Sequence, residues 1–182
     1  MGHPKKSKKR YEKPRRPWEM TRIKEERELA EMYGLKSKRE IWKAASYIKK
    51  YKRQIRAILA EIAGMKPTEH TLRKKDAILA ALRRRGILKE SEGASGKVED
   101  ILALTVEDIL ERRLQTRVYK KGLSNSMKHA RQLIVHGHIA VDGRRVTIPS
   151  YIVDVVEDKK IDYYGEPPVT IKTKVAAEEV AE

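Results

Sequence analysis

The chain has 182 residues, with 42 Lys and Arg against 26 Asp and Glu, so its formal net charge is +16. This length suits one ordinary domain or two small ones and is too short for a large enzyme. Cysteine is absent, which excludes a disulfide scaffold, a thiol nucleophile and a cysteine-ligated metal site. No apolar run approaches the ~20 residues that span a bilayer, and no apolar stretch follows the basic N-terminus. These features predict a cytosolic, soluble protein whose partner is a polyanion.

The positive charge is concentrated near the N-terminus. Residues 1–60 carry 20 Lys and Arg against 7 Glu, whereas residues 61–110 are balanced, with 9 of each sign. Residues 1–16 contain eight Lys or Arg, two prolines and no apolar periodicity. We therefore expect a disordered basic arm that becomes ordered against phosphates.

Three amphipathic helices are expected in the N-terminal half, over residues 17–34, 37–64 and 68–86, the last of which begins at Thr68 or at Thr71. In the second helix, Ser37 is the expected N-cap and Glu40 its capping-box partner. No single helix can hide its own apolar stripe, so the three are expected to pack together as a helical domain.

Two more helices are expected in the C-terminal half. The first begins at Thr105 and Asp108 and runs to Gly122, and the second covers residues 126–136, capped by Asn125 or Ser124. The apolar period then changes from 3.6 to 2 around an Asp-Gly pair at residues 142–143, which is a strong hairpin signal. Further strands are expected over residues 151–155 and 161–163.

The expected fold class is therefore α+β. A basic arm and a small helical domain precede a helix–helix–β-hairpin domain with a small antiparallel sheet. The expected boundaries are a disordered arm at 1–16, a helical domain at 17–104 with a loop at 91–96, the second domain at 105–165 and a flexible tail at 166–182.

The helix over residues 126–136 has one apolar and one polar face. Its polar face offers donors for phosphates and for base or ribose edges. Basic side chains before this helix, in the hairpin and in the N-terminal third add further positively charged donors for nucleic acid. The candidate nucleic-acid contacts are Arg15, Arg16, Lys49, Lys50, Arg53, Arg112, Arg113, Arg117, Lys120, Lys121, Lys128, His129, Arg131, Gln132, His136, His138, Arg144 and Arg145.

Residues 110–153 resemble the RNA-binding domain of ribosomal protein S-four. The matching motifs are ARQL at 130–133, HGHI at 136–139 and IPS at 148–150. The same domain occurs in some pseudouridine synthases, in a tRNA synthetase and in a heat-shock protein. By itself the domain therefore implies only a structured RNA as partner.

The N-terminal half narrows the resemblance to the archaeal and eukaryotic branch of the ribosomal protein. KPRRPWE at 13–19, YGL at 33–35 and KREIW at 38–42 carry it. The resemblance implies a primary binder of small-subunit ribosomal RNA that helps nucleate assembly and supports translational accuracy. It also implies neighbouring small-subunit ribosomal proteins as partners and a place in the cytoplasmic small subunit. By position it adds Ser126 to the RNA-facing residues.

Other classes of protein remain as alternatives. A small-subunit assembly factor and a stand-alone RNA-binding factor would share the second domain. An RNA-modifying enzyme is disfavoured because residues 1–105 contain no glycine-rich phosphate loop and no convincing acid–base pair. His136 and His138 suggest a metal pair, but no third ligand stands at a plausible spacing. We expect no catalytic residue, cofactor, metal, membrane or small-molecule substrate.

The two tryptophans allow different interpretations. Trp42 adjoins Ile41 on the apolar stripe of its helix, so core packing is the better prediction there. Trp18 follows Pro17 at a helix start and either packs as a hydrophobic staple or stacks on an RNA base.

Overall fold

The computed structural model describes residues 10–64, 68–88 and 98–165. The expected loop at 91–96, the tail at 166–182 and residues 1–9 of the arm lie outside the described residues. A small antiparallel sheet accompanies a mostly helical chain, which confirms the α+β fold class. The helices are α1 (Met20–Met32), α2 (Lys38–Gly64), α3 (Glu69–Arg84), α4 (Val98–Ala103), α5 (Val106–Glu111), α6 (Leu114–Lys120), α7 (Met127–His136) and α8 (Val155–Asp158).

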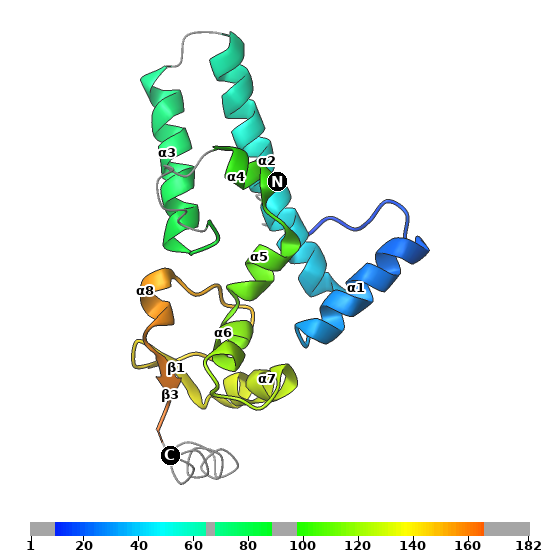
Figure 1. Cartoon of the computed structure of the whole chain (residues 1–182), viewed down its shortest axis with the longest axis vertical. Coiled ribbons are helices and arrows are strands. Elements are labelled where there is room, and N and C mark those ends of the chain that lie inside the picture. Colours follow the sequence, from blue (N-terminus) through cyan, green and yellow to red (C-terminus); the bar gives the residue numbers. More distant parts are fainter. Residues whose placement is uncertain (1–9, 65–67, 89–97, 166–182) are drawn as a thin grey trace, which may run out of the picture.

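The long helix α2 is the axis of the first core. Figure 1 shows α3 running back alongside it and α1 leaving its N-terminal half at an angle. The buried side chains of α2 recur at helical spacing, as the sequence predicts. They are Ile41, Ala44, Ile48, Ile55 and Ile58. Helices α4 and α5 also pack on α2, so this core extends to Leu110.

The second core lies between α6, α7 and the sheet. Ala130, Leu133 and Ile134 of α7 are at most 4% exposed, which confirms the predicted apolar face of this helix. Burial of each large aliphatic side chain contributes about 1.5–3 kcal/mol, so this face holds α7 in place. The second core begins at Leu114, and the two cores therefore meet at residues 112–113.

The sheet has the order β2-β1-β3, with β1 (Ile139–Val141) in the centre and β2 (Arg144–Arg145) and β3 (Ile161–Tyr163) antiparallel to it. The turn between β1 and β2 has positive φ at Asp142 (53°) and Gly143 (75°). Asp-Gly tolerates this backbone geometry, which matches the twist of a hairpin. The predicted hairpin is confirmed.

The helix expected from Thr105 to Gly122 is interrupted in the structure. Residues 151–153 return along its middle: the Leu114 N–H donates to the Tyr151 carbonyl at 2.8 Å, and the Val153 N–H donates to the Arg112 carbonyl at 3.0 Å. These hydrogen bonds replace the helical ones at residues 112–113 and separate α5 from α6. The apolar spacing stays helical across the break, so the sequence showed no sign of it.

The strand expected over residues 151–155 is likewise reduced to a single bridge, between Ile152 and Arg113. The chain instead enters α8, which is capped by Asp154 and Glu157: the Asp154 N–H donates to the Glu157 carboxylate at 3.1 Å. The alternating apolar pattern pointed to a strand, but this capping pair favours a helical turn.

Of the expected N-caps, Ser37 is confirmed, because its Oγ accepts from the Arg39 N–H at 3.3 Å at the start of α2, but two other details differ. Helix α7 is capped by Ser126 itself, rather than by Asn125 or Ser124. Glu40 is not used as a capping-box partner for Ser37, because its carboxylate pairs with Arg113 and Arg131 of the second domain. The cap Thr68 on α3 agrees with one of the two expected positions.

Residues 10–16 carry no helix or strand, but they lie against α2 rather than forming a free arm. The Glu12 N–H donates to Ser46 Oγ at 3.0 Å, and the Glu12 carboxylate pairs with Lys49. The ring of Tyr11 packs 5.9 Å from that of Trp42, centroid to centroid. These contacts require a folded α2, so composition alone could not indicate them.

Candidate nucleic-acid interface

Helix α7 presents the polar face that the sequence assigns to nucleic acid. Ser126 Oγ accepts a hydrogen bond from the His129 N–H at 3.1 Å, which fixes the start of the helix. Lys128, Gln132 and His136 are exposed. They follow one another at intervals of four residues, so they line one side of the helix. His129 is half-buried beside the cap.

The hairpin places more donors beside the C-terminal end of α7. Arg144 and Arg145 are exposed, and Arg145 donates to the His136 carbonyl at 3.0 Å. The rings of His136 and His138 lie nearly parallel, 6.4 Å apart. The absence of a side chain at Gly137 lets the Arg145 guanidinium approach the backbone, since a Cβ at Gly137 would lie 1.9 Å from Arg145 Nε. These exposed donors form what we call the α7–hairpin surface: Lys128, Gln132, His136, His138, Arg144 and Arg145.

Two lysines at the end of α6 are exposed and held by weak internal contacts. Lys120 lies 3.3 Å from the Glu111 carboxylate, and Lys121 donates to the Ile161 carbonyl at 3.3 Å. Exposed pairs of this kind contribute little to stability, so both ammonium groups can exchange partners for a phosphate.

Arg112 and Arg117, by contrast, use their guanidinium groups inside the protein. Arg117 makes two hydrogen bonds to the Asp158 carboxylate, at 2.7 and 2.5 Å. Arg112 lies 3.6 Å from the same carboxylate and donates to the Arg85 carbonyl at 2.8 Å and the Val153 carbonyl at 3.0 Å. These bonds tie the residue after α3, the segment before α8 and the last residue of α8 to the α5–α6 break.

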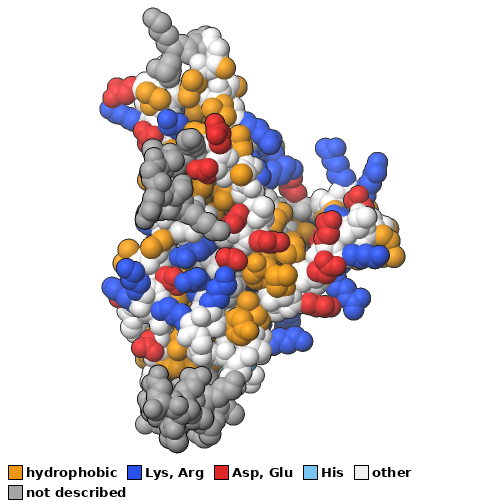
Figure 2. Space-filling view, in the orientation of Figure 1, with side chains coloured by type: hydrophobic (Ala, Val, Ile, Leu, Met, Phe, Trp, Pro, Cys, Tyr) orange, Lys and Arg blue, Asp and Glu red, His pale blue; other side chains and the backbone are white. Residues whose placement is uncertain are grey.

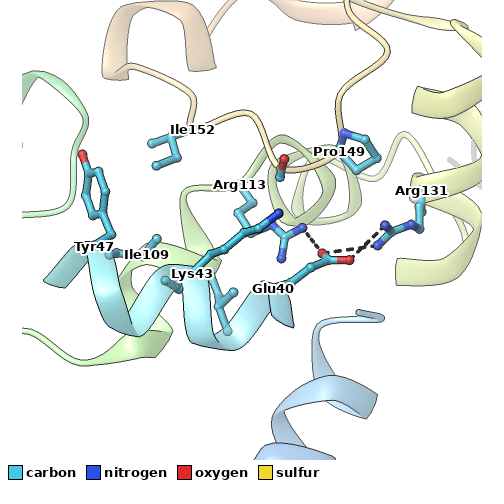
Figure 3. Close-up of a pocket in the computed structure, with 11 residues that line it drawn as sticks. Glu40, Lys43, Tyr47, Ile109, Arg113, Arg131, Pro149 and Ile152 are labelled. Carbon is cyan, nitrogen blue, oxygen red and sulfur yellow. Dashed lines mark hydrogen bonds and ion pairs between the residues drawn. The ribbon is translucent and has the colours of Figure 1, made fainter. Parts of the chain in front are cut away.

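Arg113 and Arg131 share the carboxylate of Glu40 across the junction between the two cores (Figure 3). Arg131 is 3.0 Å from Glu40 Oε1, and the side chain of Arg113 is only 6% exposed. Burial raises the pKa of the Glu40 carboxyl, but the hydrogen bonds from Arg113 and Arg131 outweigh it and hold the pKa below its ordinary value. Glu40 is therefore charged near neutral pH and links α2 to α6 and α7.

Gln115 is a junction residue that sequence reasoning missed. It is 1% exposed, and its side-chain amide donates to the Gly34 carbonyl at 3.1 Å and to the Met127 carbonyl at 2.8 Å. One side chain therefore joins the α1–α2 turn to the start of α7. Its apolar neighbours in the sequence suggested only a core helix, and no signal indicated a hydrogen-bonding role.

The basic residues of the N-terminal third form a separate group on α2 and the segment before α1. Arg15, Arg16, Lys49, Lys50 and Arg53 are exposed. Figure 2 shows Lys and Arg side chains gathered along one side of α2. A cleft of about 400 Å³ between α2 and the start of α5 is lined by four of the α2 cations: Lys49, Lys52, Arg53 and Arg56.

The two tryptophans differ in burial and in contacts. Trp42 is half-buried and its Nε1 donates to the Glu26 carboxylate at 2.9 Å, so it combines packing with a hydrogen bond. Trp18 is 88% exposed and forms no part of either core.

In the part of the chain that the structure describes, no three His, Asp or Glu side chains are grouped so as to hold a metal ion. Among the described helices, none has the length and apolar character needed to cross a bilayer.

The second core and its basic helix belong to a recognised class of domain: residues 112–159 match the family described as "S4 domain". Relatives named "Small ribosomal subunit protein uS4" are similar over far more of the chain. That of Methanothermobacter thermautotrophicus is 48% identical over 100% of both chains. Those of Saccharolobus solfataricus and Methanocella arvoryzae are 51% and 46% identical, over 93% and 97% of this chain and 92% and 85% of their own. The chain belongs to the uS4 family of small ribosomal subunit proteins, which confirms the resemblance read from the sequence.

Proposed function

We propose that this chain is a structural constituent of the small ribosomal subunit in the cytoplasm and a primary binder of small-subunit ribosomal RNA. In this role it helps nucleate assembly of the subunit, supports translational accuracy and contacts neighbouring ribosomal proteins. Family membership supports the ribosomal assignment. The single observation that carries RNA binding is the α7–hairpin surface, where exposed cations and hydrogen-bond donors meet on one compact unit.

The proposal gives the basic residues two kinds of role. Side chains that are exposed, or half-buried in the case of His129, contact RNA directly, through phosphates, 2′-hydroxyls and base edges. These are the α7–hairpin surface with Ser126, His129, Lys120 and Lys121, and the N-terminal group Arg15, Arg16, Lys49, Lys50 and Arg53. The internally bonded arginines have a structural role: Arg112, Arg113 and Arg131 hold the two cores against each other, and Arg117 holds α8 on α6.

A substitution in α7 tests RNA binding directly. Lys128→Gln removes an exposed charge on the proposed surface, while Lys74→Gln removes one from α3 outside it. Lys128→Gln should weaken binding to a small-subunit ribosomal RNA fragment by about 1–3 kcal/mol, and Lys74→Gln should not. Equal losses in the two variants would mean that only net charge matters.

Sedimentation tests the ribosomal role. The tagged chain should migrate with mature small subunits through a gradient at high salt. Its presence only on immature particles would instead indicate an assembly factor.

A further inference from the structure

A cavity of about 370 Å³ lies at the junction between the two cores (Figure 3). Helix α2 forms one wall, and α5, Arg131 of α7 and the loop before α8 form the others. The inner lining is mainly apolar: Ala44, Tyr47, Ile109, Leu110, Pro149 and Ile152. Its size and mixed character are typical of pockets that take a small organic group.

The charged lining carries more positive than negative groups. Arg113 and Arg131 share the carboxylate of Glu40. Lys43, one helical turn further along α2, forms no ion pair with any described residue. An anionic guest would complement this positive excess, and the exposed Lys43 is free to approach it.

An unpaired nucleotide has this combination of properties. Splayed-out RNA bases stack on aromatic rings or guanidinium planes, and their edges form hydrogen bonds. Tyr47 offers a half-buried ring, and Arg131, whose side chain is 24% exposed, offers a guanidinium plane beside an apolar space. Arg131 also belongs to α7, so this helix contributes both to the cavity lining and to the α7–hairpin surface.

We propose that this cavity receives one unpaired nucleotide of the bound RNA, with its base among the apolar side chains and its phosphate near Lys43 and Arg131. The inference rests on the proposed RNA-binding function and specifies how part of that RNA is held. Since both cores contribute walls, the inserted nucleotide would join them and favour one angle between them.

A titration of the intact chain tests the cavity without any variant. The δ1 methyl groups of Ile109 and Ile152 are labelled for NMR, and adenosine 5′-monophosphate or uridine 5′-monophosphate is added. At least one nucleotide should shift both methyl signals in a saturable manner, and inorganic phosphate should not. Unshifted signals with both nucleotides, or equal shifts with phosphate, would overturn the proposal.

A matched pair of variants tests the cavity in the RNA complex. Ser150→Trp puts a large ring at the rim, whereas Thr147→Trp puts the same ring at an exposed position outside this lining. If the added ring excludes the base, its stacking is lost, and Ser150→Trp should lower affinity for a small-subunit ribosomal RNA fragment about 5- to 150-fold. Thr147→Trp should bind as the unaltered chain does.

The outcomes separate this inference from the function on which it rests. If Ser150→Trp is folded and binds the ribosomal fragment as tightly as Thr147→Trp, the cavity holds no nucleotide while RNA binding stands. If the unaltered chain shows no preference for ribosomal RNA, the proposed function fails, and the nucleotide titration still tests the cavity.

Discussion

At the scale of single residues, charge near the interface divides into groups that face solvent and groups that face the protein. Lys128 and Arg144 are exposed, while Arg113 is almost completely buried against Glu40. The sequence presents all of them as one basic set, because composition and helical spacing do not show which carboxylate a side chain will meet. Glu40 and Arg131 are 91 residues apart along the chain. Only the folded arrangement of α2 and α7 brings them together.

Glu40→Gln should destabilise the protein in a pH-dependent way. The pKa of Glu40 is lower in the folded protein than its ordinary value of 4.5. Its pairing therefore stabilises the fold above that value, and this contribution is lost as the pH falls toward the lower, folded pKa. Near neutral pH the variant should lose about 1.5–3 kcal/mol of unfolding free energy.

Denaturant unfolding of both proteins across a pH series measures this difference. It should be largest near neutral pH and should shrink as the solution becomes more acidic than pH 4.5, the ordinary value for this carboxyl. A difference that stays constant through the acid range would show that the carboxylate charge is not what joins the two cores.

At the scale of elements, the sequence predicts helices and turns that local residues determine, but not those that depend on distant parts of the chain. The α7 helix, its apolar face and the Asp142-Gly143 hairpin follow from local rules, and they are confirmed. The break between α5 and α6 was not predictable, because it results from hydrogen bonds with residues 151–153, about forty positions away. Helix α4 was also missed. A six-residue helix contains too few turns for its periodicity to be recognised.

Ser126→Ala should destabilise α7 and leave the rest of the fold in place. It removes the oxygen that accepts from the His129 N–H, and such a change costs about 0.5–2 kcal/mol. Chemical denaturation measures the loss, with Ser126→Thr as a control that keeps a capping hydroxyl. If the Ala and Thr variants are equally stable, the hydroxyl does not cap the helix.

At the scale of the whole molecule, the two cores are distinct apolar clusters that are joined by polar contacts and by Met127 and Ile152, which pack on the first core. Glu40, Gln115 and Arg112 each bond across the junction. Gly34 adds a close approach there: its φ is +57°, and a Cβ would lie 2.9 Å from the Met127 Cβ. The sequence predicted the order of the two parts, but their relative placement depends on these long-range contacts. We interpret the joined cores as a clamp that holds neighbouring RNA segments.

Deletion of residues 1–16 should lower RNA affinity and make its salt dependence less steep. Each phosphate contact that is lost should reduce the log–log slope by about 0.7–0.9. A full-length variant in which every Lys and Arg of residues 1–16 is replaced by Gln is the control for lost packing on α2. Unchanged affinity and slope in both proteins would show that this segment does not bind RNA.

We propose that the chain recognises small-subunit ribosomal RNA by shape as well as by charge. Equilibrium binding to a fragment from the 5′ domain of that RNA, compared with an unrelated structured RNA of equal length at low and high salt, tests it most directly. We expect the preference for the ribosomal fragment to persist at high salt. Equal binding of both RNAs, with both released by salt, would contradict it, because the net charge of +16 would then explain the binding.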